Sequence, residues 1–305
     1  MNPNNSFLIV MPQHQKELQQ QFSRLQPHGQ YQVDFAETAA AEDLKSPLPI
    51  IFVQPHTPHF SQVAEGETSL SINLISPGSS DPNDIAAQII AHPHTANLSW
   101  IGYQSYLTPF QLLALMRARY FTPLRLGNYR EKPTSAESLI RPNNLSFIDL
   151  SAVRHSDAPD GLTKEPNGLY AEEICQLAHY IGISSRPKTC YIYGYPQNIE
   201  SSPITSQLIV QILWHLLESF STNLYENPQD PNQQAFFSTR EVYMGDHNHI
   251  LFFLCSKQTG RLWIKIPSQE DGFSYLPCSQ EEYATALNGE LPAVWIHHYQ
   301  KINLQ

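Results

Sequence analysis

The stretch NLSFIDLSAVRHSDAPDGLTKEPNGLYAEE, residues 144–173, decides the fold of this chain. It begins with an apolar run, residues 145–150, that has the length and composition of a buried strand. A loop rich in Ser, Asp, Pro and Gly follows, and then an acidic helix start. Strand, loop and helix in this order form the repeating unit of an α/β sheet, whose ligands bind beyond the carboxyl ends of the strands.

The same alternation extends over the first 221 residues. Thr108 and Pro109 are expected to start one helix, as N-cap and first helical residue. The sequence therefore predicts a parallel sheet covered by helices on both faces. The predicted strands are residues 7–11, 48–55, 69–76, 98–104, 145–150 and 189–195, and the predicted helices are residues 13–25, 83–91, 108–120, 169–181 and 205–220.

The character of the chain changes after residue 221. A polar, proline-broken segment leads to two apolar runs joined at Gly260, which predict a hairpin. Ser279 is expected to cap a short helix with Glu281 and Glu282 in its first turn. We therefore predict an α/β domain at residues 1–221 and, at residues 222–305, a hairpin-and-helix extension packed on that domain.

Composition excludes some classes of function. The chain has 305 residues, 41% of them hydrophobic, and a formal net charge of −10, which argues against nucleic-acid binding. The apolar run near the start is too short for a membrane span and lacks a signal-peptide pattern, so no membrane partner is expected. Four cysteines without paired short spacing predict free thiols and a cytoplasmic location.

Several segments, in the same order, resemble the arginase (ureohydrolase) superfamily, in its bacterial formimidoylglutamase-like branch. They are YFTPLRLGNYRE, LSFIDLSAVRHSDAP, PNGLYAEEICQLAHYIGIS, TGRLWIKIP, LPCSQEEY and NGELPAVW. The resemblance implies a three-layer arginase-like fold. It also implies that three motifs, each after a strand, would hold two manganese ions that activate water for hydrolysis of an amidine.

The third of these motifs is only partly present. Ser146, Phe147 and Asp149 match its opening, but Ser151 stands where the second metal-binding aspartate belongs. Glu173 falls where the family has a glutamate that orients the substrate. Asp149 and Glu173 are therefore the candidate catalytic residues. Alternatively, Asp149 is a strand-end aspartate that accepts hydrogen bonds from the backbone or from Arg154. The alternative for Glu173 is a solvated acid on the helix.

The other two motifs are largely lost. His56 occupies the place of a ligand histidine after the first motif's strand, but the neighbouring glycines and aspartate are missing. Ser76 and the four residues after it replace the second motif, and none of them is a ligand in that register. His56 and Asp149 are thus vestigial metal positions. Arg154 and Asn167 are candidate binding residues.

Two functions remain open. The first is a catalytically degenerate arginase-fold protein with a binding or scaffold role, no cofactor and an unidentified ligand or protein partner, since most carboxylates that would hold manganese are gone. The alternative is a hydrolase of linear C–N bonds in amidines, with an altered or mononuclear site that binds manganese weakly. The resemblance also leaves room for a homo-oligomer.

Overall fold

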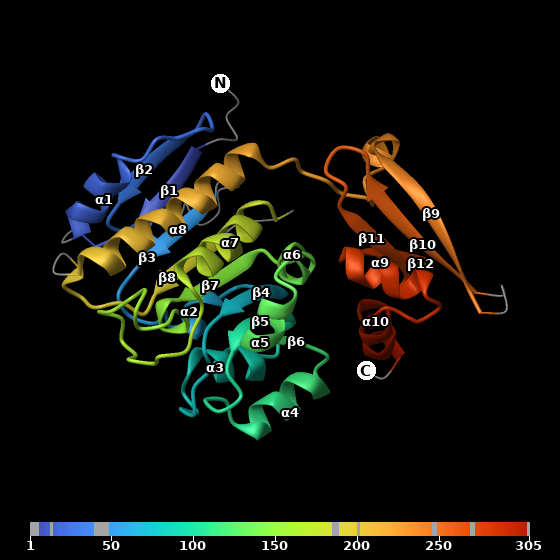
Figure 1. The fold of residues 1–305 in the computed structure, drawn as a ribbon, viewed down its shortest axis with the longest axis horizontal. Coiled ribbons are helices and arrows are strands. Elements are labelled where there is room, and N and C mark those ends of the chain that lie inside the picture. The colour runs from blue at the N-terminus through green and yellow to red at the C-terminus, as the bar shows by residue number, and fades with distance from the viewer. Residues whose placement is uncertain are drawn as a thin grey trace.

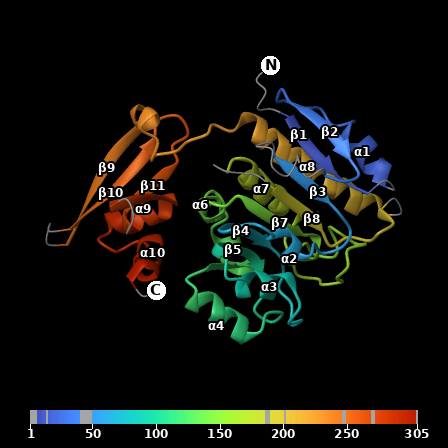
Figure 2. The same ribbon diagram turned by 180° about the vertical axis from the view of Figure 1, so that it is seen from behind.

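The computed structural model describes residues 6–12, 15–39, 49–184, 189–199, 202–245, 249–268 and 272–303. Within these ranges the chain forms an eight-stranded parallel sheet wrapped by helices and a separate four-stranded antiparallel sheet near the C-terminus (Figure 1). The predicted α/β class is confirmed. Seen from behind, the second sheet again lies to one side of the large sheet (Figure 2).

The large sheet has the order β2-β1-β3-β8-β7-β4-β5-β6. All neighbouring pairs are parallel. The central strands are apolar runs buried on both faces, as expected for a parallel sheet. The strands are β1 (Ser6–Val10), β2 (Gln32–Ala36), β3 (Ile50–Val53), β4 (Leu70–Ile75), β5 (Thr95–Tyr103), β6 (Thr122–Arg125), β7 (Leu145–Asp149) and β8 (Thr189–Tyr193).

Helices cover both faces of this sheet and give the predicted three layers. One face packs against α1 (Lys16–Phe22), α5 (Leu126–Glu131), α6 (Ser135–Ile140), α7 (Ala171–Gly182) and α8 (Pro203–Thr222). The other face packs against α2 (Phe60–Val63), α3 (Ile85–Ala91) and α4 (Phe110–Ala118). Because side chains alternate along a strand, Ile148 contributes to the first core, whereas Phe147 contributes to the second.

The start of α4 differs from the prediction by one residue. The N-cap is Pro109, not Thr108, and Phe110 is the first helical residue. The Thr108 hydroxyl donates a hydrogen bond to the Gln104 carbonyl oxygen at 3.0 Å, so it is committed to the preceding turn. The predicted capping role of Thr108 is therefore wrong, because its side chain serves the preceding loop.

The C-terminal part is larger than a hairpin. The predicted hairpin is formed by β10 (His249–Ser256) and β11 (Leu262–Ser268), and β9 (Phe237–Met244) and β12 (Gly272–Cys278) extend it on either side. Helices α9 (Gln280–Leu287) and α10 (Ala293–Asn303) supply Tyr283, Ala286, Val294 and Trp295 to the core beside this sheet.

The cap of α9 matches the sequence prediction. The Ser279 hydroxyl accepts from the Glu282 backbone N–H at 3.2 Å, and the Glu282 carboxylate accepts from the Ser279 N–H at 2.9 Å. This reciprocal pair satisfies two N–H groups at the helix start. The link from α8 contains a short 3₁₀ helix, η5 (Pro231–Phe236). No helix in the described part of the chain is both long and apolar enough to cross a bilayer.

Candidate functional site

Asp149 ends β7, at the carboxyl edge of the large sheet. Its Oδ1 atom accepts from the Ser151 backbone N–H at 2.9 Å and starts the 3₁₀ turn η3 (Leu150–Ala152). Gly194, just after β8, lies directly against it with φ +85°, and a Cβ atom there would be 2.4 Å from Asp149 Oδ1. The close approach of these two neighbouring strand ends therefore requires glycine.

The pKa of the Asp149 carboxyl differs from that of an ordinary aspartate. Burial raises the pKa of Asp149 to about 6, the two hydrogen bonds from Ser151 oppose the rise, and the charge of Asp84 adds to it. Asp84 caps α3 by accepting from the Ala86 N–H at 2.9 Å. A carboxyl with this pKa can accept or donate a proton close to neutral pH.

Tyr193, at the end of β8, belongs to the same group of side chains. Burial, together with the charges of Asp149 and Asp84, raises the pKa of its phenol well above the ordinary value. The hydroxyl is buried and has no hydrogen-bond partner among the described residues. A neutral donor therefore accompanies the carboxyl groups of Asp149, at a strand end, and Asp84, at the start of α3.

Glu173 lies in the first turn of α7 and is not a solvated acid. Its carboxylate accepts from the Tyr170 backbone N–H at 2.8 Å and pairs with Arg130 at 3.1 Å. Arg130 also donates to the Gly168 carbonyl oxygen at 2.6 Å, and its guanidinium lies 4.2 Å from the centre of the Tyr170 ring. Glu173 therefore fastens the helix start to α5.

Arg154 also lies over the Tyr170 ring, and it pairs with Asp157, not with Asp149. Its guanidinium lies 4.2 Å from the ring centre, and its Nε donates to Asp157 Oδ1 at 2.8 Å. Asp157 Oδ2 accepts from the Ala171 N–H at 3.0 Å. Burial alone would raise the pKa of Asp157, but the hydrogen bonds from Arg154 and Ala171 lower it below its ordinary value.

The remaining predicted positions are scattered. His56 is exposed, and its carbonyl oxygen accepts from the Gln54 side chain at 2.8 Å. Ser76 is buried and accepts from Trp100 Nε1 at 3.0 Å. Asn167 is exposed, and its carbonyl oxygen accepts from the Gln104 side chain at 3.3 Å. Arg154 and Glu173 thus meet at the start of α7, whereas no described contact joins them to Asp149 or His56.

The donor set does not fit the metal centre that the resemblance implies. Among the described residues, no three His, Cys, Asp or Glu side chains gather closely enough to hold one ion. Asp149 already accepts a hydrogen bond from the Ser151 backbone N–H at 2.9 Å. A pair of divalent cations needs several anionic oxygen ligands, and this edge offers Asp149 with Asp84 beside it.

Asp84 and Tyr193, which interact with Asp149, are not indicated as site residues by the sequence. Asp84 caps α3 and Tyr193 lies in an apolar strand, and neither position in the sequence indicates a site. Alternation along β8 places Tyr193 on the α3 face, with Tyr191. This alternation is the sequence feature that indicates Tyr193 as a neighbour of α3.

Known structures share this fold at low sequence identity. Formiminoglutamase from Trypanosoma cruzi with manganese matches with a TM-score of 0.60 at 11% identity, over 72% of this chain and 94% of that chain. A quadruple mutant of an arginase-like protein from Trypanosoma brucei matches with a TM-score of 0.53 at 10% identity, over 73% and 92%. The fold is arginase-like.

Formimidoylglutamase from Bacillus subtilis has the same arginase-like fold, with a TM-score of 0.57 at 11% identity, over 73% of this chain and 89% of that chain. No protein-family model and no curated protein matches the sequence. At this level of identity the likeness concerns the fold alone. The participation of Asp149 or Glu173 in catalysis stays a prediction.

Proposed function

We propose that this chain is a catalytically degenerate arginase-fold protein that lacks the dinuclear manganese site and acts as a binding or scaffold protein. The observation that carries the proposal is the pairing of Asp149 with Ser151. The Ser151 backbone N–H donates to Asp149 Oδ1 at 2.9 Å, and the Ser151 side chain helps to lower the pKa of this carboxyl. An aspartate in that position would repel Asp149 without a cation between them, whereas serine is uncharged and does not.

Two neighbouring acids, Glu173 and Asp157, support the same conclusion. Glu173 is committed to the Tyr170 N–H and to Arg130. Asp157 is committed to Arg154 and to the first turn of α7. These acids therefore stabilise a loop and a helix start, and they need no bound ion to do so. The Trypanosoma brucei protein of this fold is a mutant with three serines changed to aspartate and one arginine to histidine, so serine in place of aspartate has a parallel there.

A second candidate function is hydrolysis of a linear C–N bond in an amidine, of the formimidoylglutamase or agmatinase kind. The pKa of about 6 for Asp149, next to the buried Tyr193 hydroxyl, favours it. Asp149 could serve as a general base near neutral pH, and Tyr193 could donate a hydrogen bond to a leaving nitrogen. This route uses an altered site and no pair of ions.

One experiment separates the two functions. The purified protein is incubated with manganese, bound metal is measured by mass spectrometry, and hydrolysis of formimidoylglutamate, arginine and agmatine is followed. We expect no stoichiometric manganese and no turnover. Two equivalents of bound manganese, with turnover that is abolished by Asp149→Asn and kept by Asp160→Asn, would refute the first proposal. Turnover without bound metal that Asp149→Asn abolishes would establish the second.

Three further features are part of the proposal. We take residues 1–221 and 222–305 as two units, since α8 ends at Thr222 and the second sheet begins at Phe237. We also propose a cytoplasmic location, in line with four free cysteines, all buried. Self-association of the chain is the third, and size-exclusion chromatography with light scattering would measure it.

A further inference from the structure

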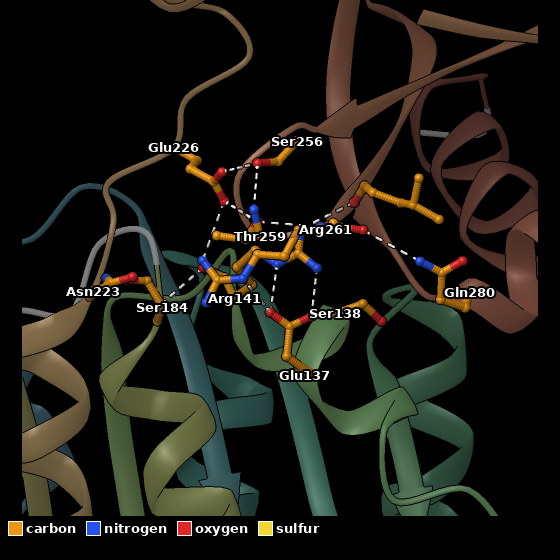
Figure 3. Close-up of polar contacts among 12 residues, drawn as sticks. Glu137, Ser138, Arg141, Ser184, Asn223, Glu226, Ser256, Thr259, Arg261 and Gln280 are labelled. Carbon is orange, nitrogen blue, oxygen red and sulfur yellow. Dashed lines mark hydrogen bonds and ion pairs between the residues drawn. The ribbon is translucent and has the colours of Figure 1, made fainter. Parts of the chain in front are cut away.

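A cavity of about 370 Å³ lies between the large sheet's helices and the C-terminal sheet. Its walls come from α6 and α7 on one side, and from the β10–β11 turn and the start of α9 on the other. Figure 3 shows the polar contacts that join the two parts beside it. A volume of roughly 300 Å³ or more, at a junction between two parts of a fold, is typical of small-molecule sites.

Arg141, at the end of α6, has hydrogen-bond partners for all three nitrogen atoms of its guanidinium group. It is buried, its Nε donates to Glu137 Oε1 at 2.9 Å, and its Nη2 donates to the other oxygen of the same carboxylate. Its Nη1 donates to the Leu262 carbonyl oxygen at 3.0 Å, and its guanidinium covers the Trp263 ring at 4.7 Å. Arg141 therefore clamps the C-terminal sheet to α6 and has little capacity left for a ligand (Figure 3).

Arg261, which also lines the cavity, is incompletely paired. Its side chain is 13% exposed, and its ion pairs with Glu137 and Glu226 are 3.4 and 3.6 Å long. Charge-assisted hydrogen bonds are about 2.7–2.9 Å long, so both pairs are longer than a well-formed one. Both carboxylates are already committed, Glu137 to Arg141 and Glu226 to the hydroxyls of Ser256 and Thr259. The Arg261 guanidinium thus retains N–H donors beside the cavity.

Glu281, in the first turn of α9, supplies the opposite charge. Its carboxylate accepts from the Thr134 hydroxyl at 3.3 Å, and no ion pair between described residues includes it. Burial raises its pKa, but hydrogen bonds and the charge of Lys132 outweigh burial and lower it below the ordinary value. Glu281 therefore stays ionised and can accept hydrogen bonds from a cationic ligand.

We propose that this cavity binds a small zwitterion, specifically a free α-amino acid. Its carboxylate takes the unused donors of Arg261, and its ammonium group takes the carboxylate of Glu281. The four charged residues of the wall are Arg141, Arg261, Glu137 and Glu281, two of each sign, so the wall is neutral. A phosphate or a polyamine would leave one sign uncompensated in a half-enclosed space, whereas a zwitterion matches both.

The ligand would touch both parts of the molecule at once. Thr134 and Glu137 belong to the large domain, and Arg261 and Glu281 belong to the C-terminal part. Binding would consequently stabilise the junction between them. Asp149 does not line this cavity, so the manganese and hydrolysis experiment neither supports nor weakens this inference.

The test is isothermal titration calorimetry of the full chain with glycine, L-alanine, L-serine and L-glutamine at millimolar concentration. Acetate, ethylammonium, inorganic phosphate and betaine are the controls. Betaine carries the same two charges but has no N–H donor for Glu281. We expect heat of binding from at least one of the four amino acids and none from the controls.

Variants place the ligand at this cavity. Arg261→Lys replaces the planar fork of donors by a single ammonium group, and Glu281→Gln removes the negative charge; each should raise the Kd by about tenfold or more. Glu290→Gln, an exposed acid outside the cavity wall, should bind like the wild type. The proposal is overturned if none of the four amino acids binds, if both cavity variants bind like the wild type, or if phosphate or acetate binds as tightly.

Discussion

Replacing Asp149 by asparagine should stabilise the protein at neutral and alkaline pH. Asparagine is nearly isosteric and can still accept the Ser151 N–H at 2.9 Å through its side-chain oxygen. What the substitution removes is the ionised form, which burial and Asp84 disfavour.

The magnitude follows from the pKa. In the unfolded chain the carboxyl titrates near its ordinary value of about 4, and in the folded protein at about 6. Between these values the folded state holds more protons than the unfolded state, so wild-type stability falls as pH rises through that window. Two units correspond to about 3 kcal/mol. The variant should match the wild type below about pH 4 and exceed it by up to about 3 kcal/mol above pH 7.

Urea denaturation, followed by tryptophan fluorescence at several pH values between 4 and 8, measures the difference. Asp160→Asn removes an exposed carboxyl on the loop that follows β7 and should track the wild type at every pH. If Asp149→Asn is the less stable protein at pH 8, or if its difference from the wild type is independent of pH, the ionised carboxylate is stabilised by its surroundings and the reasoning is wrong.

Two further substitutions test the geometry of the predicted site. Gly194→Ala should cost well over 1–2 kcal/mol, roughly the cost of a left-handed residue alone, because the new Cβ would also meet Asp149 Oδ1. Gly289→Ala, with φ +84° but open space around it, should cost only the left-handed term; equal unfolding midpoints for the two variants would contradict the close contact. Glu173→Gln should cost about 1 kcal/mol or less, since it loses the Arg130 ion pair and keeps an acceptor for the Tyr170 N–H. A much larger loss in thermal unfolding would mean that the ion pair carries the helix start.

The sequence predicts the central strands of the fold, but it does not predict the strands at the edges of the sheets. Strands β3, β4, β7 and β8 are short apolar runs, which a parallel sheet buries on both faces. Edge strands β2 and β6 are not predicted, because exposed polar residues such as Gln32 and Arg125 interrupt any apolar run there. The outer strands β9 and β12 are not predicted for the same reason. Their exposed aromatic residues, such as Tyr243 and Phe273, share their strands with polar residues and form no long apolar run.

Side-chain partners were harder to predict than elements. Arg130 contacts the neighbouring loop by donating to the Gly168 carbonyl oxygen, a partner that its place in the sequence does not indicate. The sequence allows Glu173 to be either a substrate-orienting residue or a solvated acid, whereas the structure shows a third arrangement, an ion-paired helix cap. Local spacing could not reveal this, because Arg130 and Glu173 are 43 residues apart in the chain.

The sequence alone determined the order of buried strands and covering helices, and it showed that serine replaces aspartate at residue 151. These properties depend on residue type and short periods, which any chain segment carries by itself. Only the tertiary structure brought Asp84, Asp149 and Tyr193 to one strand edge, and Arg261 and Glu281 to one cavity. Those groupings join residues far apart in the chain, so their charges and hydrogen bonds act on one another only after the sheet and its helices have packed.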